Sequence, residues 1–236
     1  MLHEVIDKYY LDKEKGRDRS KAQNHFYISQ TGKCPRHLFF KFKNVPEKEL
    51  EPHMLRLFDH GDHMHQLIMS ALTSTRDIHV VASEVKIPPQ ELISGRADAV
   101  ISDGNQLYVL DIKSMNSMIF KSLTEPKPEN IWQIQLYLYY FRIPKGILLY
   151  VNKDNLQLKE FIFDYDPDQA KKLLADLRFL RNQIDTNIVP KRLESYPNNW
   201  ECRYCQYKSI CDIGAQDEMK WDDFKTQVQG VSSSEE

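Results

Sequence analysis

The stretch SGRADAVISDGNQLYVLDIKS, residues 94–114, decides the fold of this chain. Its two halves are rich in β-branched, aromatic and aliphatic residues, and Gly104 and Asn105 stand between them, which is typical of two strands joined by a tight turn. With these two residues as the turn, Asp98 faces Asp111 across the hairpin. Opposed side chains of such a pair lie ~5 Å apart at their Cβ atoms. Two carboxylates at that distance repel each other unless a cation lies between them or one of them is protonated.

The same hairpin predicts a metal site. Strand alternation puts Lys113 on the face of Asp111 and turns Ile112 toward the core. A Mg²⁺ or Mn²⁺ ion held by Asp98, Asp111 and the Ile112 carbonyl would polarise a phosphate oxygen and activate a water, and Lys113 would orient that water. This is the chemistry of phosphodiester hydrolysis. A solvent-facing salt bridge at a strand end is the alternative, because the motif is short.

Hydrophobic periodicity predicts the elements around the hairpin. A helix over 50–74 and a strand over 78–87 precede it. It is followed by a helix over about 128–142, strands over 145–152 and 156–163, and a helix over 167–187 that Asp166 and Pro167 open. This order predicts an α/β sandwich with a mixed sheet.

Two of these helices carry further candidates for the site. His65 lies on the inward side of the first helix, where it is either a core histidine or an additional metal ligand. Gln135 and Tyr139 are four residues apart on the second helix and share a face, so they either pack on the sheet or support the site. Glu84, inside an apolar strand, is a lower-ranked candidate carboxylate.

The four cysteines predict one soft-ligand site. Cys202, Cys205 and Cys211 form a C-x2-C-x5-C cluster, and the remaining thiolate comes from the distant Cys34. With none left over, the set favours a single four-thiolate site, which zinc and a [4Fe–4S] cluster both accept. A zinc ribbon normally uses two close pairs, so the lone Cys34 is unusual for zinc. Either centre would clip the C-terminal region to the N-terminal one.

Composition narrows the class of protein. The chain has 236 residues, 41% hydrophobic and 28% charged, and a net charge of −2, which excludes wholesale disorder and a uniformly basic surface. No apolar run is long enough for a membrane span and the first residues do not resemble a signal peptide, so a cytoplasmic protein without membrane contact is expected. We expect a polar N-terminal arm over 1–24, a nuclease domain over 25–214, and a flexible acidic tail over 215–236, seven acidic against two basic residues from 212 onward.

Taken in order, these motifs resemble those of a known family. His65, GRAD ending in Asp98, DIK with Asp111 and Lys113, and Gln135-x3-Tyr139 resemble the RecB-like branch of the PD-(D/E)XK nucleases. The lone cysteine followed by C-x2-C-x5-C resembles the iron–sulfur staple of the same branch. The compact length, with no helicase motor motif, is most similar to the CRISPR-associated Cas four exonucleases and their stand-alone relatives.

The resemblance implies a restriction-endonuclease-like core with a mixed central sheet flanked by helices and an iron–sulfur clasp. It implies a [4Fe–4S] cluster on Cys34, Cys202, Cys205 and Cys211, and Mg²⁺ or Mn²⁺ on His65, Asp98, Asp111 and the Ile112 carbonyl. In that reading Lys113 is catalytic, and Gln135 and Tyr139 support the site.

The resemblance also implies a substrate and partners. Members of the family degrade single-stranded DNA, often from the 5′ end, and some cut endonucleolytically. In CRISPR systems they trim prespacers and help to choose protospacer-adjacent motifs with the Cas-one/Cas-two integrase. Whether the chain forms a homo-oligomer stays open. A non-catalytic DNA-binding protein and an iron–sulfur redox sensor are the alternative functions.

Local charge predicts the path of the DNA. The first 50 residues carry eleven basic and seven acidic side chains. We expect the strand to pass Arg36, Lys41 and Lys43 on one side, and Arg203 and Lys208 near the cysteine clasp. The candidates for stacking on unpaired bases are Tyr27, Phe39 and Tyr204, although core packing is the favoured environment of Phe39.

Overall fold

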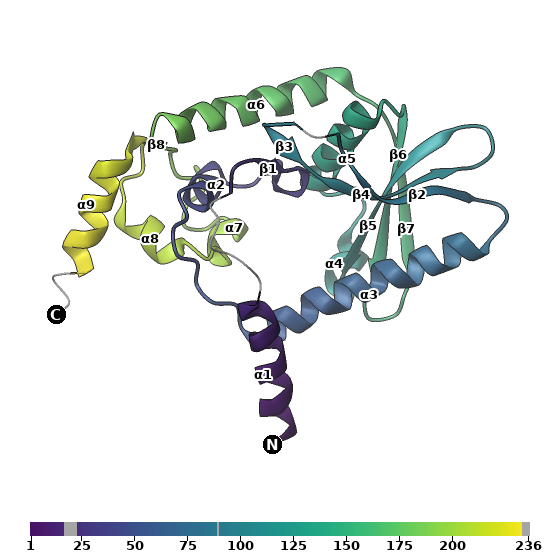
Figure 1. The fold of residues 1–236 in the computed structure, drawn as a ribbon, viewed down its shortest axis with the longest axis horizontal. Helices are drawn as coiled ribbons and strands as arrows, with labels where there is room; N and C mark the ends of the chain where they lie inside the picture. Colours follow the sequence, from purple (N-terminus) through teal and green to yellow (C-terminus); the bar gives the residue numbers. More distant parts are fainter. Residues whose placement is uncertain (17–22, 89, 233–236) are drawn as a thin grey trace.

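A computed structural model of the chain describes residues 1–16, 23–88 and 90–232. Figure 1 shows a central sheet with helices against it and, at the other end of the molecule, a lobe of short helices. The long helix α6 (Pro167–Asp185) runs from one part to the other. Asp166 caps its first turn by accepting hydrogen bonds from the N–H groups of Asp168 and Gln169, and Pro167 follows at the first helical position, as predicted.

The central sheet is mixed, as the sequence predicts. Its strands lie in the order β2-β4-β5-β6-β7, and β5 and β6 are parallel while the other neighbours are antiparallel. The parallel pair needs a long crossover, which helix α5 provides. The strand bounds are β2 His79–Lys86, β4 Arg96–Ser102, β5 Leu107–Met115, β6 Lys145–Asn152 and β7 Leu158–Asp164.

Helices cover the two faces of this sheet. On one face, helix α3 (Pro52–Ser74) packs Met64, Ile68 and Leu72 against buried residues of β4 and β5, among them Ile112. On the other lie α4 (Ser117–Ser122) and α5 (Pro128–Phe141). Helix α5 approaches β6 closely because Gly146 has no side chain; a Cβ there would lie 2.7 Å from Ile134. The sheet thus holds the hairpin between two helices that can both reach it.

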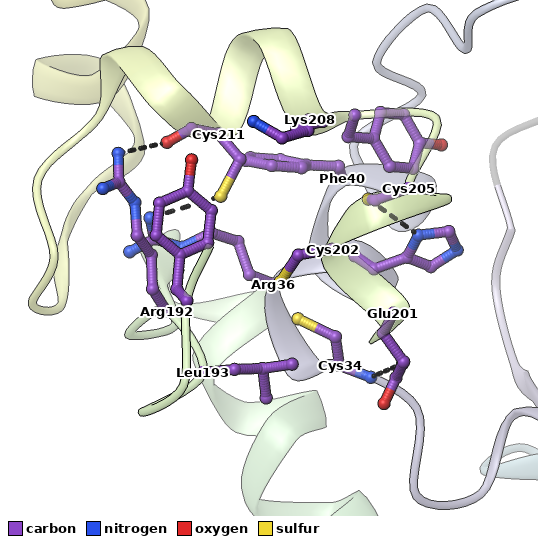
Figure 2. Close-up of a pocket in the computed structure, with 13 residues that line it drawn as sticks. Cys34, Arg36, Phe40, Arg192, Leu193, Glu201, Cys202, Cys205, Lys208 and Cys211 are labelled. Carbon is purple, nitrogen blue, oxygen red and sulfur yellow. Dashed lines mark hydrogen bonds between the residues drawn. The ribbon is translucent and has the colours of Figure 1, made fainter. Parts of the chain in front are cut away.

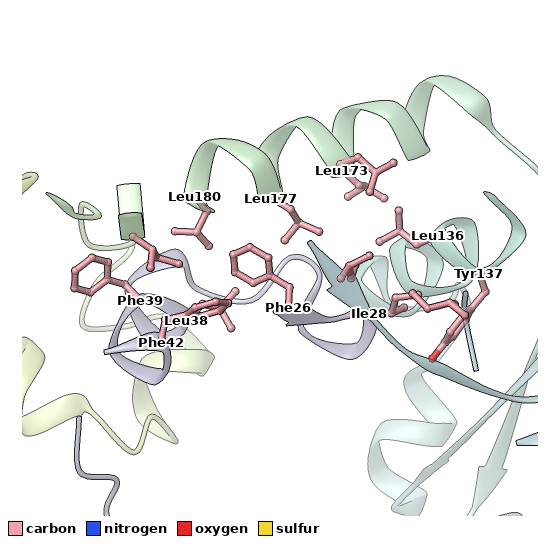
Figure 3. Packing of buried hydrophobic residues seen from close by; sticks show 14 of the residues in the cluster. Phe26, Ile28, Leu38, Phe39, Phe42, Leu136, Tyr137, Leu173, Leu177 and Leu180 are labelled. Carbon is pink, nitrogen blue, oxygen red and sulfur yellow. The ribbon is translucent and has the colours of Figure 1, made fainter. Parts of the chain in front are cut away.

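One apolar core joins the sheet to the short-helix lobe (Figure 3). Leu173, Leu177 and Leu180 lie on the underside of α6 and are buried. They pack over residues of α5 at one end and over Phe39 and Phe42 of α2 at the other. The lobe is therefore part of the same hydrophobic core as the sheet.

The lobe, called the clasp below, is built from segments far apart in sequence. It combines α2 (Pro35–Phe42), α7 (Trp200–Arg203), α8 (Lys208–Ile213), α9 (Trp221–Ser232), and the antiparallel pair β8 (Ile188–Val189) and β9 (Met219–Lys220). A second small pair, β1 (Phe26–Tyr27) with β3 (Ile93–Ser94), and the 3₁₀ turn Ile28–Gln30 link it to the sheet.

The expected flexible tail over 215–236 is wrong for the described part, to residue 232. Helix α9 is amphipathic: its Phe224 is fully buried, stacks with Trp221 and contacts Phe40 of α2. The acidic residues that suggested a tail, such as Asp222 and Asp223, occupy the solvent side and the first turn, where negative charge favours a helix. Residues 233–236 lie outside the described residues.

The N-terminal arm is a helix, α1 (Leu2–Lys15), that docks on α3 through polar contacts. Asp7 pairs with Arg56, and Asp59 accepts hydrogen bonds from Tyr10 and Lys13, both at 3.0 Å. Residues 17–22 of the expected arm lie outside the described residues. Among the helices of the described part, none is both long and apolar enough to cross a membrane.

Candidate functional site

The hairpin has the predicted register. Ala99 pairs with Leu110 and Ser102 with Leu107, around a turn in which Gly104 takes a φ of +89° and the Asp103 carboxylate accepts hydrogen bonds from the N–H groups of Asn105 and Gln106. The ladder ends at Ala99 and Leu110, so Asp98 and Asp111 flank its open end. There the Asp98 carboxylate accepts a 2.6 Å hydrogen bond from the backbone N–H of Ile112. The two carboxylates of the predicted pair thus lie close to the point where β4 and β5 separate, near enough for the charge of Asp98 to act on Asp111.

Asp111 is the most buried charged group of the site. Its side chain is 3% exposed, and Lys113 Nζ lies 2.8 Å from its Oδ2 atom. Burial and the negative charge of Asp98 raise the pKa of Asp111, and the neighbouring Lys113 opposes that rise. The ammonium group of Lys113 is thus the charged partner of this buried oxygen. A buried carboxylate beside an ammonium group keeps oxygen donors of the kind that a hard cation prefers.

His65 reaches the same site from α3, as predicted. Its Nδ1 atom lies 3.3 Å from Oδ1 of Asp98. Burial by itself would lower the pKa of His65, but the hydrogen bond and the negative charge of Asp98 outweigh it and raise the pKa. His65 is thus bound to a carboxylate of the site and is not an isolated core histidine.

The expectation that Gln135 and Tyr139 face the site is wrong. Gln135 is buried on another side of α5, where its amide donates to the Asp164 carbonyl and accepts from the Asp166 N–H, both at 2.8 Å. Tyr139 is 39% exposed and packs edge-on against Tyr140. Gln135 thus ties α5 to the connection between β7 and α6.

Gln133 and Tyr137, two positions earlier on α5, take the predicted places. Gln133 Oε1 accepts from Lys113 Nζ at 2.9 Å, and its amide donates to Asp111 Oδ1 and to the Tyr137 hydroxyl, both at 3.4 Å. The Tyr137 hydroxyl donates to the Arg96 carbonyl at 2.7 Å. The pair Gln133 and Tyr137 has the same spacing as the pair Gln135 and Tyr139, but a shift of two residues turns a side chain by about 200° around the helix axis. Since both glutamines are buried, their hydrogen-bond partners, rather than the spacing, distinguish the two faces.

Glu84 does not join the site. It stands in β2 between Ser83 and Val85, which pair with Ala99 and Ala97, so its position is beside Asp98. However, it adopts a positive φ of 55° and pairs with Arg96, and both side chains are more than half exposed. The expectation of a metal-binding role for Glu84 is therefore wrong.

The site offers the donors of a hard-cation centre, although its side chains are not arranged around one. Within the described residues, no three His, Cys, Asp or Glu side chains lie close enough together to hold a metal ion. The donor chemistry nevertheless fits Mg²⁺ or Mn²⁺: the carboxylates of Asp98 and Asp111 and the carbonyl of Ile112 are oxygen ligands. When bound, such an ion would polarise a phosphate oxygen and lower the pKa of a water.

The four cysteines lie together in the clasp (Figure 2). Cys34 precedes α2, Cys202 is in α7, Cys205 follows it and Cys211 is in α8, and all four line one pocket as free thiols. Burial raises the pKa of Cys34 to about 11 and also raises those of Cys202 and Cys205. Within the described residues the four thiols line this pocket without being arranged around an ion. Their chemistry nevertheless fits a metal or iron–sulfur centre, which would bind them as thiolates.

Two arginines brace the chain around these cysteines. Arg36 is 1% exposed and donates to the carbonyls of Pro190, Ala215 and Asp217, and its Nη1 lies 3.8 Å from Cys211 Sγ. Arg192 donates to the carbonyls of Cys211, Asp212 and Gly214. The expectation that Arg36 contacts DNA is therefore wrong.

The other residues of the predicted DNA path differ in their exposure and in whether they already have a hydrogen-bond or ion-pair partner. Lys43 donates to the Ile184 carbonyl, Lys41 pairs with Glu47, and Lys208 pairs with Asp212. Arg203 is exposed, and so are two of the predicted stacking residues, Tyr204 at 81% and Tyr27 at 44%. The third, Phe39, is fully buried in the core. Of the candidates, Arg203, Tyr204 and Tyr27 are the most accessible to a nucleic acid.

Comparison with known proteins agrees with this fold. The sequence profile described as the PD-(D/E)XK nuclease superfamily matches residues 2–212, nearly the whole chain. The chain therefore belongs to the PD-(D/E)XK nuclease superfamily.

Within this class, the chain is similar to the CRISPR-associated exonuclease Cas4 of Saccharolobus solfataricus, with 28% identity over 88% of this chain and 98% of that protein. It is similar to the crystal structure of SSO0001, with 26% identity, a TM-score of 0.58, and coverage of 89% of this chain and 96% of the other. The alkaline exonuclease LHK-Exo from Laribacter hongkongensis shares the fold at 14% identity and a TM-score of 0.53, over 70% of this chain and 89% of its own. The predicted resemblance is confirmed.

Proposed function

We propose that this nuclease is a Mg²⁺- or Mn²⁺-dependent deoxyribonuclease that degrades single-stranded DNA from its ends. The observation that carries the proposal is the convergence of Asp98, Asp111 and Lys113 at the open end of the hairpin, with His65 and Gln133 against them. Two carboxylates beside an ammonium group, one of them buried, are the groups that metal-assisted hydrolysis of a phosphodiester needs.

Each side chain has a stated task in this proposal. Asp98, Asp111 and the Ile112 carbonyl would hold the cation, and His65 would add an imidazole nitrogen or orient Asp98. Lys113 would hold the attacking water and offset negative charge developing on the phosphate. Gln133, whose carbonyl oxygen lies 2.9 Å from Lys113 Nζ, would position that ammonium group.

We propose further that Cys34, Cys202, Cys205 and Cys211 hold a [4Fe–4S] cluster. Its task would be structural, because it would tie α2 to α7 and α8 across most of the sequence. The likeness to a CRISPR-associated exonuclease supports a role in prespacer trimming beside the Cas1/Cas2 integrase.

The direct test is incubation of the purified protein with end-labelled single-stranded DNA, with and without Mn²⁺, for the wild type and Asp111→Ala. We expect metal-dependent shortening of the labelled strand by the wild type and none by the variant. Metal-dependent cleavage that survives the substitution would refute the catalytic assignment. Binding without cleavage by the wild type would favour the non-catalytic DNA-binding alternative, and activity that follows only the iron content would favour the redox alternative.

A further inference from the structure

A groove lies beneath α6, on the side of the molecule between the sheet and the clasp. We call it the α6 groove; it has a volume of about 530 Å³, in the range of ligand sites in proteins. One wall is formed by α6, and the other by Thr31, Gly32, Lys33 and Pro35 and by Trp132 of α5. None of the residues assigned above to the cation site or to the cysteine pocket lines it.

Two aromatic rings offer stacking surfaces in this groove. The Trp132 ring is half-buried and is held close against Gly32, where an added Cβ would lie 2.0 Å from the ring. The Phe179 ring is 63% exposed on α6. The first ring is thus fixed in place, and the second leaves apolar surface in water that a bound molecule would cover.

The charges of the groove favour an anion. Three lysines line it, Lys33, Lys172 and Lys191, against two carboxylates, Asp176 and Glu218. Glu218 accepts a 2.7 Å hydrogen bond from the neutral Gln183 amide and keeps its charge, and Lys191 lies 4.0 Å from Glu194. Lys172 has no ion pair among the described residues. Three lysines against two carboxylates leave the lining with an excess of one positive charge.

The groove lies next to residues of both the nuclease site and the cysteine clasp. Trp132 directly precedes Gln133, which contacts Asp111 and Lys113 of the nuclease site. Lys33 directly precedes Cys34 and lies 5.5 Å from the ring centroid of Trp200, a residue of the clasp that is 56% exposed. A strand bound in the groove would lie beside the helix that positions the nuclease site.

We infer that the α6 groove binds single-stranded DNA, with bases stacked on Trp132 and Phe179 and phosphates next to Lys33, Lys172 and Lys191. Aromatic rings combined with a row of cations form the general pattern of proteins that bind single strands without sequence preference. A double helix presents no unstacked bases to such rings, so the single strand is the form that this groove fits. The inference rests on the proposed function, because it supplies the nuclease with a substrate track.

Two adjacent lysines of α6 provide a matched test. Lys172 lines the groove, whereas Lys171 is equally exposed and lies near Asp168 outside it. Binding of a fluorescent oligodeoxythymidylate to the full chain is measured by anisotropy in EDTA, so that no cleavage occurs, across a range of salt concentrations. We expect Lys172→Gln to weaken binding and to reduce the slope of log K against log[salt] by about 0.7, and Lys171→Gln to change neither.

A second pair of variants tests whether bases stack on the aromatic rings of the groove. Phe179→Ala should weaken binding about fivefold or more through lost stacking, and Tyr9→Ala, which removes an exposed ring of α1, should leave it unchanged. Equal behaviour of Lys172→Gln and Lys171→Gln, together with wild-type binding by Phe179→Ala, would overturn the inference even if the wild type cleaves DNA. Conversely, groove variants that lose binding in a protein that never cleaves DNA would uphold the groove and refute the nuclease activity.

Discussion

The Asp98 carboxylate accepts a 2.6 Å hydrogen bond from the backbone N–H of Ile112, beyond the point where the ladder between β4 and β5 has ended. A buried N–H needs an acceptor, so Asp98 has a structural task besides the proposed binding of a cation. The two tasks can be separated, because an amide oxygen still accepts a hydrogen bond but carries no charge.

We therefore expect Asp98→Asn and Asp98→Ala to differ in stability and to agree in activity. The asparagine variant should unfold within about 0.5 kcal/mol of the wild type, and the alanine variant should lose about 1–2 kcal/mol because the Ile112 N–H is left without its acceptor. Both should lose DNA cleavage by about 100-fold or more, because the anionic ligand is gone. Urea unfolding and Mn²⁺-dependent cleavage measure the two effects. Equal destabilisation by both substitutions would contradict the structural task.

Substitution of Gln133 and substitution of Gln135, both on α5, should have opposite consequences for activity and stability. Gln133→Ala should lower cleavage about 10–100-fold, because Lys113 loses the acceptor that orients it. Gln135→Ala should lower the free energy of unfolding by about 1–3 kcal/mol, because the Asp166 N–H and the Asp164 carbonyl lose their partner. The rate of cleavage per folded molecule should stay at the wild-type value in the second variant. The reverse pattern, found by the same two assays, would restore the original assignment of Gln135.

The hairpin and the helices around it could be predicted because their signals are local. Alternating hydrophobic residues set the strands, Gly104 and Asn105 set the register, and the register alone brings Asp98 and Asp111 together. The helix over 50–74 is observed as Pro52–Ser74 for the same reason, and it carries His65 to the site.

What could not be predicted depends on tertiary packing. Both faces of α5 carry a Gln-x3-Tyr pair, and the structure selects Gln133 because β7 and α6 occupy the other face. Arg36 looked like a DNA contact because nothing in its neighbourhood in the sequence reveals the carbonyls of residues 190–217 that surround it. The amphipathic pattern of α9 was the available signal for the ordered C-terminal helix, and its acidic composition concealed it.

Arg36 and Arg203 were both predicted to contact DNA, but their different burial predicts different roles: Arg36 should stabilise the fold, and Arg203 should bind DNA. Arg36→Met should lower the free energy of unfolding by about 3 kcal/mol, because several buried carbonyls of the clasp lose their donor. Arg203→Met should leave stability unchanged, since its side chain is exposed, and should weaken binding of single-stranded DNA at low salt. Urea unfolding and anisotropy distinguish the two. A stable Arg36→Met variant with weakened DNA binding would show that Arg36 faces the nucleic acid after all.

Cys34 is the residue on which the proposed iron–sulfur clasp depends most, because it alone comes from the N-terminal region. Cys34→Ser should lower the iron content and the visible absorption of the protein prepared under anaerobic conditions, and should lower its Tm, since α2 would no longer be tied to α7 and α8. His37 offers the matched control, because its Nδ1 atom lies 3.6 Å from Cys205 Sγ and makes it the nearest substitute ligand. His37→Ala should keep its iron. If instead Cys34→Ser retains the full complement and His37→Ala loses it, the fourth ligand is the imidazole, and the clasp closes through α2 by a different side chain.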